Sequence, residues 1–231
     1  MPNDRHALVT GSSAGIGQAI AERLLAEGWR VTGVDRAPAA VTHPSFTALP
    51  LDLADGDAVE AAARRLGPVQ ALVHAAGVLR VGPLGDSPAA DAELMWRLHV
   101  AAASRLAEVL VPAMVDAGHG RVVLIGSRVA QGKAGRSQYA ATKAAVIALA
   151  RSWAAEVVAK GVTVNVVSPA ATRTAMLDDP ARALAKPVVP PIGRLILPDE
   201  IASLVSYLLS PAAAAITGQD LQICGGSSLN R

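Results

Sequence analysis

A glycine-rich segment near the N-terminus, from Thr10 to Gly17, constrains the fold of this chain more than any other feature. It follows a short apolar run, residues 7–10, that is typical of a strand, and it leads into a segment of helical pattern at about 15–27. Glycine allows a tight turn and close approach of phosphate oxygens, and the helix N-terminus offers free N–H groups. The segment predicts a dinucleotide site; a glycine-rich turn that binds no ligand is the alternative.

The rest of the chain alternates between short β-rich runs and longer Ala- and Leu-rich segments. The further strands are expected at 29–34, 46–51, 69–74, 121–125, 162–167 and 221–224, and the further helices at 55–66, 89–117, 137–160 and 198–209. This alternation predicts an α/β fold of Rossmann type: a doubly wound, mainly parallel sheet of about seven strands with helices on both faces. We expect one domain over residues 1–231, with a Pro-rich substrate loop at about 175–197.

Composition and charge exclude several classes of protein. Hydrophobic residues make up 52% of the 231 residues and charged residues 17%, which argues against disorder. A net charge of +2 without a basic cluster gives no reason to expect nucleic acid as a partner. A single cysteine, Cys224, favours a reducing compartment, and the apolar stretches are interrupted by charges such as Arg105 and Glu108. We expect a cytoplasmic protein with no membrane segment and no metal site.

Tyr139 and Lys143 form a candidate catalytic pair. Their i, i+4 spacing on a predicted helix places both side chains on one face. A nearby ammonium favours phenolate over phenol and so lowers the tyrosine pKa toward the working range, which allows proton transfer to or from a substrate oxygen. Ser127 follows an apolar strand, at the sheet edge where α/β proteins bind ligands. Seen alone, a Tyr/Lys pair at this spacing is more often an ordinary pair on a helix surface.

The residue at the end of the second predicted strand bears on the choice of cofactor. Asp35 lies about 20 residues after the glycines, where a carboxylate hydrogen-bonds ribose hydroxyls and repels a 2′-phosphate. We therefore expect NAD in preference to NADP. Arg36 keeps NADP possible, because a guanidinium here can serve a 2′-phosphate; a solvated surface arginine is the alternative.

These features in this order resemble the short-chain dehydrogenase/reductase family of the Ser-Tyr-Lys type, over essentially the whole chain. The matching segments are Thr10-Gly11 with Gly15 and Gly17, Asp52-Leu53, His74-Ala-Ala-Gly77, Ser127, Tyr139 with Lys143, Asn165-Val-Val-Ser-Pro-Ala170, Thr174, and Ile216-Thr-Gly-Gln leading to Gly225-Gly226. The resemblance implies hydride transfer between a nicotinamide cofactor and a secondary alcohol or ketone. Tyr139 would be the general acid/base, Ser127 would orient the carbonyl, and Lys143 would bind the nicotinamide ribose.

The resemblance also implies a set of cofactor-binding residues and an assembly. The cofactor-binding set comprises Gly11, Ser13, Gly15, Ile16, Gly17, Asp35, Arg36, Asp52, Leu53, Ala75, Ala76, Gly77, Tyr139, Lys143, Pro169, Thr172 and Thr174. The family commonly forms dimers or tetramers through its long helices, so a homodimer or homotetramer is expected. Ala-rich helix faces such as Ala140, Ala144 and Ala148 permit close helix approach and fit an ordinary core equally well.

Three positions depart from the family pattern. His99 replaces an asparagine whose backbone carbonyl holds a water in the proton relay from the lysine; the histidine preserves that main-chain part, joins the relay through its imidazole, or is simply packed. His74 and Ala75 replace the two asparagines of the motif after the fourth strand. Ala170 replaces a glycine after Pro169, which requires a backbone conformation open to a β-carbon.

Two other functions remain open from the sequence. Arg128, Lys133 and Arg136 would suit an acidic substrate or the acyl-carrier substrate of an NADPH-dependent 3-oxoacyl thioester reductase, although solvated charges on a loop are the alternative. A non-catalytic dinucleotide sensor typically loses the tyrosine or the lysine, and this chain has both.

Overall fold

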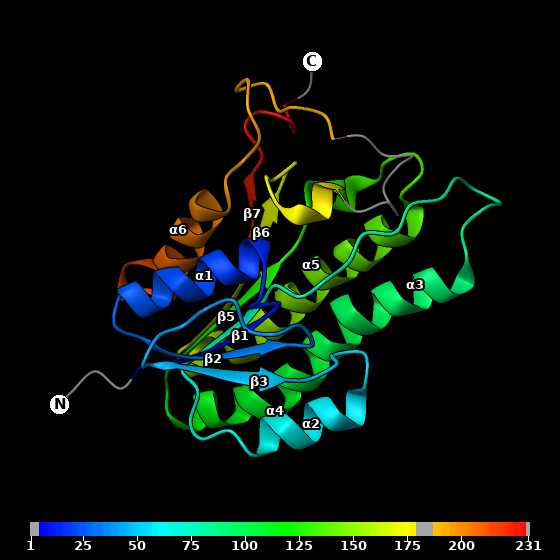
Figure 1. The fold of residues 1–231 in the computed structure, drawn as a ribbon. Coiled ribbons are helices and arrows are strands. Elements are labelled where there is room, and N and C mark those ends of the chain that lie inside the picture. Colours follow the sequence, from blue (N-terminus) through cyan, green and yellow to red (C-terminus); the bar gives the residue numbers. More distant parts are fainter. Residues whose placement is uncertain (1–4, 179–186, 230–231) are drawn as a thin grey trace.

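A computed structural model describes residues 5–178 and 187–229 (Figure 1). The strands are β1 (His6–Thr10), β2 (Arg30–Asp35), β3 (Phe46–Pro50), β4 (Ala71–His74), β5 (Gly120–Ile125), β6 (Val162–Pro169) and β7 (Asp220–Ile223). The main helices are α1 (Gly15–Ala26), α2 (Gly56–Arg64), α3 (Ala89–Trp96), α4 (Ala102–Asp116), α5 (Ser137–Val157) and α6 (Pro198–Leu209). The strands form one parallel sheet in the order β3-β2-β1-β4-β5-β6-β7. The predicted α/β class and doubly wound parallel sheet are confirmed.

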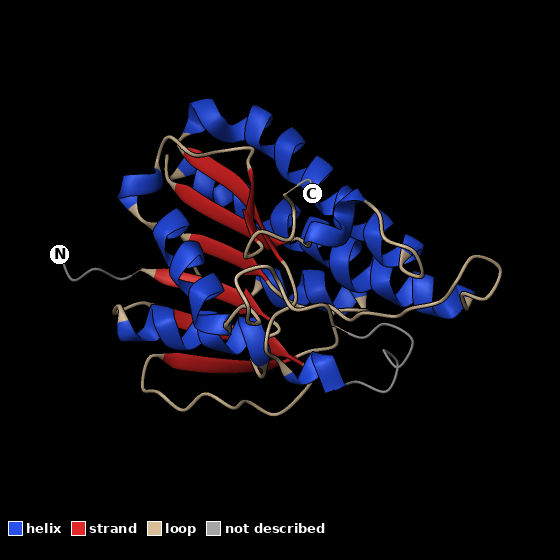
Figure 2. Cartoon of the chain, turned by 90° about the horizontal axis from the view of Figure 1, so that it is seen from above, coloured by secondary structure: helices blue, strands red, loops and turns tan. Residues whose placement is uncertain are grey.

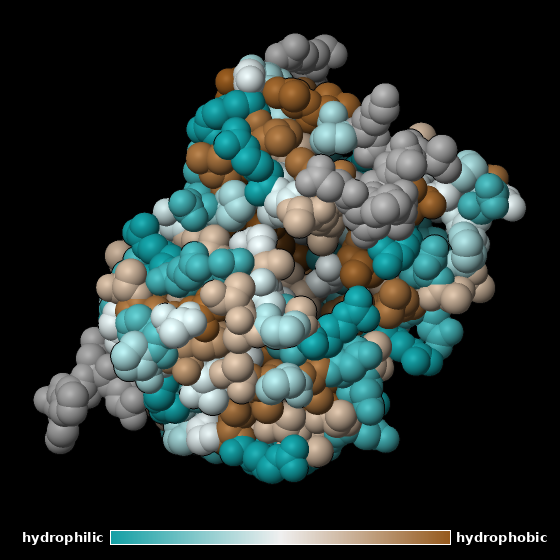
Figure 3. All heavy atoms as spheres, viewed as in Figure 1, coloured by the Kyte–Doolittle hydropathy of each residue, from teal (hydrophilic) through white to brown (hydrophobic). Residues whose placement is uncertain are grey.

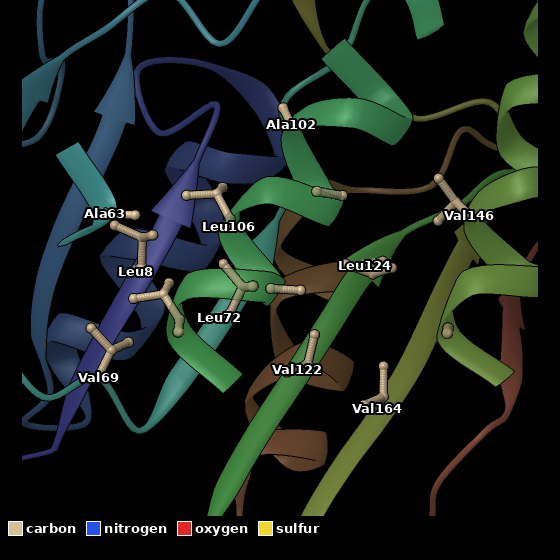
Figure 4. Packing of buried hydrophobic residues seen from close by; sticks show 14 of the residues in the cluster. Leu8, Ala63, Val69, Leu72, Ala102, Leu106, Val122, Leu124, Val146 and Val164 are labelled. Carbon is tan, nitrogen blue, oxygen red and sulfur yellow. The ribbon is translucent and has the colours of Figure 1, made fainter. Parts of the chain in front are cut away.

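Helices cover both faces of this sheet (Figure 2). α1 and α6 pack together on one face, and α2, α4 and α5 lie on the other. Successive side chains of a strand point to opposite faces, so Leu8 of β1 joins one buried cluster while Ala7 and Val9 join the other. Figure 4 shows the first of these clusters, in which leucine and valine side chains of the strands meet the helices. Two apolar layers thus hold the carboxyl ends of the strands in fixed positions.

The strand order creates a crevice beside β1. Its neighbours are β2 on one side and β4 on the other, so the connections that follow β1 and β4 leave in different directions. Ligands of open α/β sheets bind at such a switch point, outside the carboxyl ends of the strands. Thr10 stands opposite His74 and Val34 in register, which brings the segments after β1, β2 and β4 to the same edge.

The long helical region before β5 differs from its expected form. It is interrupted by a π-helical turn, Arg97–Ala101, between α3 and α4, and His99 lies in this turn fully buried. By length and composition, Ala89–Asp116 is apolar enough to cross a membrane, whereas no such segment was expected from the sequence. Six apolar residues of α4 are buried, and the helix packs against α2 and the sheet. The core helix of a water-soluble protein can have the same length and composition.

Most of the other expected elements differ from the observed ones by a few residues at their ends. α6 has the expected bounds, and its start carries Pro198 followed by two acidic residues. β6 extends to Pro169, two residues further than expected. Within the expected substrate loop, residues 179–186 lie outside the described part. The described flanks include a 3₁₀ turn, Ala175–Asp178, and a bridge between Thr172 and Ile196.

Candidate active site

A cavity of about 740 Å³ lies at the carboxyl edge of the sheet. Figure 3 shows a hollow on this face of the molecule, with apolar residues gathered above it. All four predicted catalytic residues line the cavity: Ser127, Tyr139, Lys143 and His99. Every residue of the predicted cofactor-binding set lines it as well, except Ser13. Residues far apart in the sequence, predicted from separate motifs, therefore face one space.

The glycine loop after β1 has no room for side chains. Gly11 and Gly15 have φ values of +69° and +55°, a region that other residues rarely adopt. A β-carbon on Gly17 would lie 2.1 Å from the Gly11 carbonyl oxygen, and one on Gly11 would lie 2.9 Å from the backbone of Ala76. The loop can therefore lie close to the segment that follows β4, and its glycines line the cavity. Thr174 closes the other side, because a β-carbon on Gly15 would lie 3.1 Å from its methyl group.

The N-terminus of α1 keeps its backbone donors available. No side chain caps it, and its first turn contains no acidic residue. The first N–H groups of a helix have no partner within the helix and carry positive potential, so they bind anions such as a pyrophosphate. The glycine loop and this helix end together form a cradle that fits a dinucleotide.

Asp35 shapes the adenosine side of the cavity. Its Oδ2 accepts a hydrogen bond from the Ser13 backbone N–H at 3.0 Å, and its Oδ1 accepts one from Ala37 N–H at 2.9 Å. Ser13 Oγ donates to the Ala37 carbonyl at 3.1 Å, so Ser13 supports the loop from outside the cavity. Each carboxylate oxygen has further acceptor capacity for a ribose hydroxyl. The exposed Arg36 also lines this end.

Ser127 stands at the end of the loop that follows β5, buried at 8% exposure. Its extended backbone caps a 3₁₀ turn, Arg128–Gln131, and its Oγ accepts a hydrogen bond from Val129 N–H at 3.2 Å. A hydroxyl that accepts one bond still has its own proton to donate. Ser127 is therefore fixed in place with a donor available to the cavity.

Lys143 is a buried cation beside Tyr139. Its Nζ donates to the Ile125 carbonyl at 2.8 Å and lies 5.8 Å from the centre of the Tyr139 ring. Burial lowers the pKa of Lys143 from 10.5 to about 8. An ammonium has three N–H donors, so two remain beyond the bond to Ile125. Helix α5 carries both side chains, which is why the i, i+4 spacing brings them to one side.

His99 has both ring nitrogens engaged. Thr142 Oγ1 donates its proton to the Tyr139 carbonyl at 2.8 Å, so His99 Nδ1 must be the donor in its 2.9 Å bond to the same oxygen. Its Nε2 accepts from Val78 N–H at 3.1 Å. Burial, then Lys143, then His74, hold the pKa of His99 well below 6.5. These partners assign a neutral imidazole with its proton on Nδ1, packed edge-on against the Tyr139 ring at 5.6 Å.

His74 connects the glycine-loop strand to the π-helical turn. Its Nε2 donates to the Leu98 carbonyl at 2.9 Å, and its Nδ1 accepts from Thr10 Oγ1 at 3.0 Å. Thr10 Oγ1 in turn accepts from the backbone N–H groups of Ala75 and Ala76, each at 3.1 Å. Burial, followed by the charge of Lys143, lowers the pKa of His74 to about 4, so it is neutral. The side-chain hydrogen bonds expected to differ from the family pattern are thus provided by an imidazole.

The hydrogen-bonding roles of two residues of this network were not predicted from the sequence. Thr10 and Thr142 are buried and carry the hydrogen bonds of the two histidines, but each resembles an ordinary strand or helix residue. One signal was available: the ends of the first and fourth strands must meet in a doubly wound sheet, which predicts contact between Thr10 and His74. Ala170, as expected, adopts a conformation open to a β-carbon, since no described non-glycine residue has a positive φ.

Comparisons with known proteins agree over almost the entire chain. A family model described as enoyl-(acyl carrier protein) reductase matches residues 11–228. The 3-oxoacyl-(acyl-carrier-protein) reductase FabG of Escherichia coli (strain K12) is 37% identical over 234 residues, covering 95% of this chain and 96% of the relative.

Solved structures show the same fold. A protein described as a short chain dehydrogenase/reductase family protein is 36% identical, with a TM-score of 0.89 and 98% of each chain covered. An actinorhodin polyketide ketoreductase, solved with NADPH, is 28% identical with a TM-score of 0.89, covering 100% of this chain and 99% of that one. Sequence and fold therefore agree with the motifs that face the cavity.

Proposed function

The chain belongs to the short-chain dehydrogenase/reductase family, NAD(P)-dependent oxidoreductases that act on CH–OH and carbonyl groups, and from this membership we propose which of its residues do the chemistry. A nicotinamide cofactor, when bound, supplies or accepts the hydride. The glycine loop and the uncapped N-terminus of α1 would hold its pyrophosphate. The remaining cavity-lining residues of the predicted cofactor-binding set would surround its adenosine and nicotinamide ends.

Three side chains would serve the proton transfer to or from the substrate oxygen. In ketone reduction, Tyr139 gives its phenolic proton to the carbonyl oxygen; in alcohol oxidation it takes that proton back. Ser127 donates its free hydroxyl proton to the same oxygen and so orients the carbonyl. Lys143 stabilises negative charge that develops on the Tyr139 oxygen and binds the ribose hydroxyls with its remaining N–H groups. The observation that carries this proposal is that all three line one cavity together with the glycine loop.

A direct assay tests this function. The purified protein is mixed with NADH or NADPH and a panel of ketones, and with the oxidised cofactors and the matching secondary alcohols. We expect cofactor consumption that depends on substrate with at least one member of the panel. Binding of cofactor without turnover of any ketone, alcohol or oxoacyl thioester would favour a non-catalytic sensor.

We propose NAD as the preferred cofactor, on the strength of Asp35. Its carboxylate lies at the cavity end next to the loop, where it would repel a 2′-phosphate. Asp35→Asn keeps the side-chain shape and removes the charge. It should lower the ratio of NADPH Kd to NADH Kd by about tenfold, which corresponds to one lost charge repulsion at the edge of the cavity. Fluorescence titration of both cofactors measures this ratio.

Asp57→Asn is the matched control for the cofactor prediction. Asp57 is fully exposed on α2 and lies outside the cavity, so its replacement should leave the ratio unchanged. If wild-type protein already binds NADPH more tightly, Arg36 rather than Asp35 determines the preference.

The second candidate function is NADPH-dependent reduction of a 3-oxoacyl thioester. The name of the E. coli relative favours it, as does the NADPH in the structure of the polyketide ketoreductase. A 3-oxoacyl pantetheine thioester, assayed with NADPH beside simple ketones with NADH, distinguishes the two. Faster turnover of the thioester with NADPH would replace the leading proposal.

We propose that His99 helps to position Tyr139. The neutral imidazole joins the Val78 backbone to the turn of α5 that carries Tyr139, through Thr142. Participation of the imidazole in the proton relay is the alternative prediction. The two roles predict different pH dependences of the reaction rate, because a fixed neutral ring does not titrate in the working range.

His99→Asn should lower the free energy of unfolding by about 1–3 kcal/mol and reduce kcat, because the shorter amide cannot reach both partners and leaves one buried group unsatisfied. The midpoints of the pH–rate profile should not move. Thr142→Ser, which keeps the hydroxyl, serves as the mild control, while Thr142→Val should resemble His99→Asn. A shifted acidic limb in His99→Asn would assign the imidazole to the relay instead.

We further propose a single domain, a cytoplasmic location and a homodimer or homotetramer. One continuous sheet supports the single domain. Of the alanines considered for close helix packing, Ala140 is buried in the core, whereas Ala144 and Ala148 are exposed on α5. Together with the exposed Ala141, they form a small-residue face on which a second copy of α5 could pack. Sedimentation that shows only monomer would contradict the assembly.

A further inference from the structure

The substrate half of the cavity is lined by cations. Arg80 follows β4, and Arg128, Lys133 and Arg136 follow β5, on the side of Ser127 and Tyr139. The acidic residues among the described lining are Asp35, the last residue of β2, and Asp52, which follows β3; both lie at the other end of the cavity. The charge around the reacting position is therefore positive, and in a partly enclosed space it attracts and holds anions.

Arg128 has an incomplete set of hydrogen bonds. Its Nη1 donates to the Ser227 carbonyl at 3.3 Å, and its Nε is buried with no hydrogen-bond partner within the described residues. Arg80, in contrast, lies 3.6 Å from the carboxylate of Asp91. The buried Nε of Arg128 is out of reach of a ligand, but the Arg128 Nη2 is not buried and has no hydrogen-bond partner within the described residues, so this end of the guanidinium can donate to an acceptor in the cavity.

We propose that the substrate carries a carboxylate close to its reacting carbonyl and that Arg128 binds it, an inference that rests on the proposed hydride transfer at Tyr139. Ser127 and Arg128 line the same cavity, and Ser227, which accepts a hydrogen bond from the Arg128 guanidinium, lines it as well, so an anion on that guanidinium shares this space with the carbonyl that Ser127 orients. A guanidinium matches a carboxylate with two parallel hydrogen bonds.

The position of Arg128 favours a short oxo acid over a carrier-bound acyl group. In a thioester the group next to the ketone is neutral, and the phosphates lie at the far end of the pantetheine arm. The apolar part of the cavity lining, which includes Leu79, Leu94, Met176, Val188 and Val189, suits a hydrocarbon portion of the same substrate. The ligand class is therefore an oxo acid, or the corresponding hydroxy acid, with an apolar chain.

Pairs of acids and esters test this assignment. Six-carbon 2-, 3- and 4-oxo acids are assayed beside their methyl esters, which differ only in charge, with wild-type protein and the variants Arg128→Gln and Arg128→Lys. Wild type should use the best acid at least about tenfold better than its ester in kcat/KM. Arg128→Gln should raise KM for the acid by about 10- to 100-fold and leave the ester unchanged. Arg128→Lys should be intermediate, and Arg151→Gln, an exposed change on α5 outside the cavity, should have no effect.

Several results would overturn the assignment. Equal kcat/KM values of wild type for acid and ester would do so. An equal loss of kcat/KM for both substrates in Arg128→Gln would also do so, because Arg128 would then only hold the Ser227 backbone. Preference for a 3-oxoacyl pantetheine thioester over the free acid would also overturn it.

Binding without turnover separates this inference from the proposed function. Hexanoate and methyl hexanoate are titrated into protein saturated with NAD. Tighter binding of hexanoate that is lost in Arg128→Gln, with no oxo acid reduced, would mean that the proposed reaction is wrong while the anion site stands. If hexanoate binds no better than its ester, the anion site is rejected whatever the turnover.

Discussion

Tyr139→Phe should lower kcat by about 10²- to 10⁴-fold, the range for loss of a general acid/base. The substitution removes one hydroxyl and keeps the ring, so the edge-on contact with His99 and the hydrogen bonds of its backbone remain. Cofactor affinity should fall much less than kcat: Tyr139 is itself a predicted cofactor contact, but the glycine loop and Lys143 are untouched. Steady-state rates and a cofactor titration on the same preparation separate these two effects.

The chain contains a matched control for this variant. Its only other tyrosine, Tyr207, lies half-exposed on α6, away from the cavity. Tyr207→Phe should keep wild-type rates. If Tyr139→Phe retained activity, the proton would have to come from another group, and the chemical part of the proposal would fail.

Lys143→Met should lower kcat/KM by about 10²- to 10³-fold, a range typical for removal of one preorganised electrostatic group. Unlike Tyr139→Phe, it should also weaken binding of the cofactor, because two of the three N–H donors of Lys143 are available to the ribose. Lys160→Met, an exposed change in the 3₁₀ turn that follows α5, serves as the control. Wild-type cofactor affinity in Lys143→Met would contradict the ribose contact.

The same variant makes a prediction about stability. Burial lowers the pKa of Lys143 to about 8, below the value of 10.5 for a free lysine, so between these pH values the unfolded chain binds more protons than the folded one. The contribution of this group to the free energy of unfolding therefore rises with pH across that window. Below the window Lys143 is charged in both states, and the full cost of burying that charge destabilises the fold. Thermal melting of both proteins should show the difference in Tm moving in favour of wild type as pH rises from 8 to 10.5. A constant difference would mean that Lys143 does not titrate as a buried group.

Local signals were enough to predict much of the fold and most of the cavity lining. Helix α6 begins at a proline followed by acidic residues, and such a start is specified within a few residues of sequence. The glycines after β1 are required by backbone geometry and steric contact, so their spacing alone predicts the loop. The positions of Ser127, Tyr139 and Lys143 on the cavity follow from a strand end and one turn of helix.

Other features depend on contacts between distant parts of the chain and could not be predicted this way. The π-helical turn at 97–101 has no local signature, and it coincides with the bond from His74 to the Leu98 carbonyl. The low pKa of His99 depends on burial by the folded chain and on Lys143 and His74, which belong to other elements. The helical pattern predicted the extent of the region at 89–117. It could not show where the helix widens into the π-helical turn, which holds one more residue than an ordinary helical turn.

The central claim is that this cavity binds a nicotinamide dinucleotide for hydride transfer, and a paired titration tests it most directly. NADH and NADPH are added separately to the pure protein while the fluorescence of the reduced nicotinamide is followed. The account predicts that wild type and Tyr139→Phe both bind NADH saturably, and that both bind NADH more tightly than NADPH. Absence of saturable binding of either cofactor would contradict it.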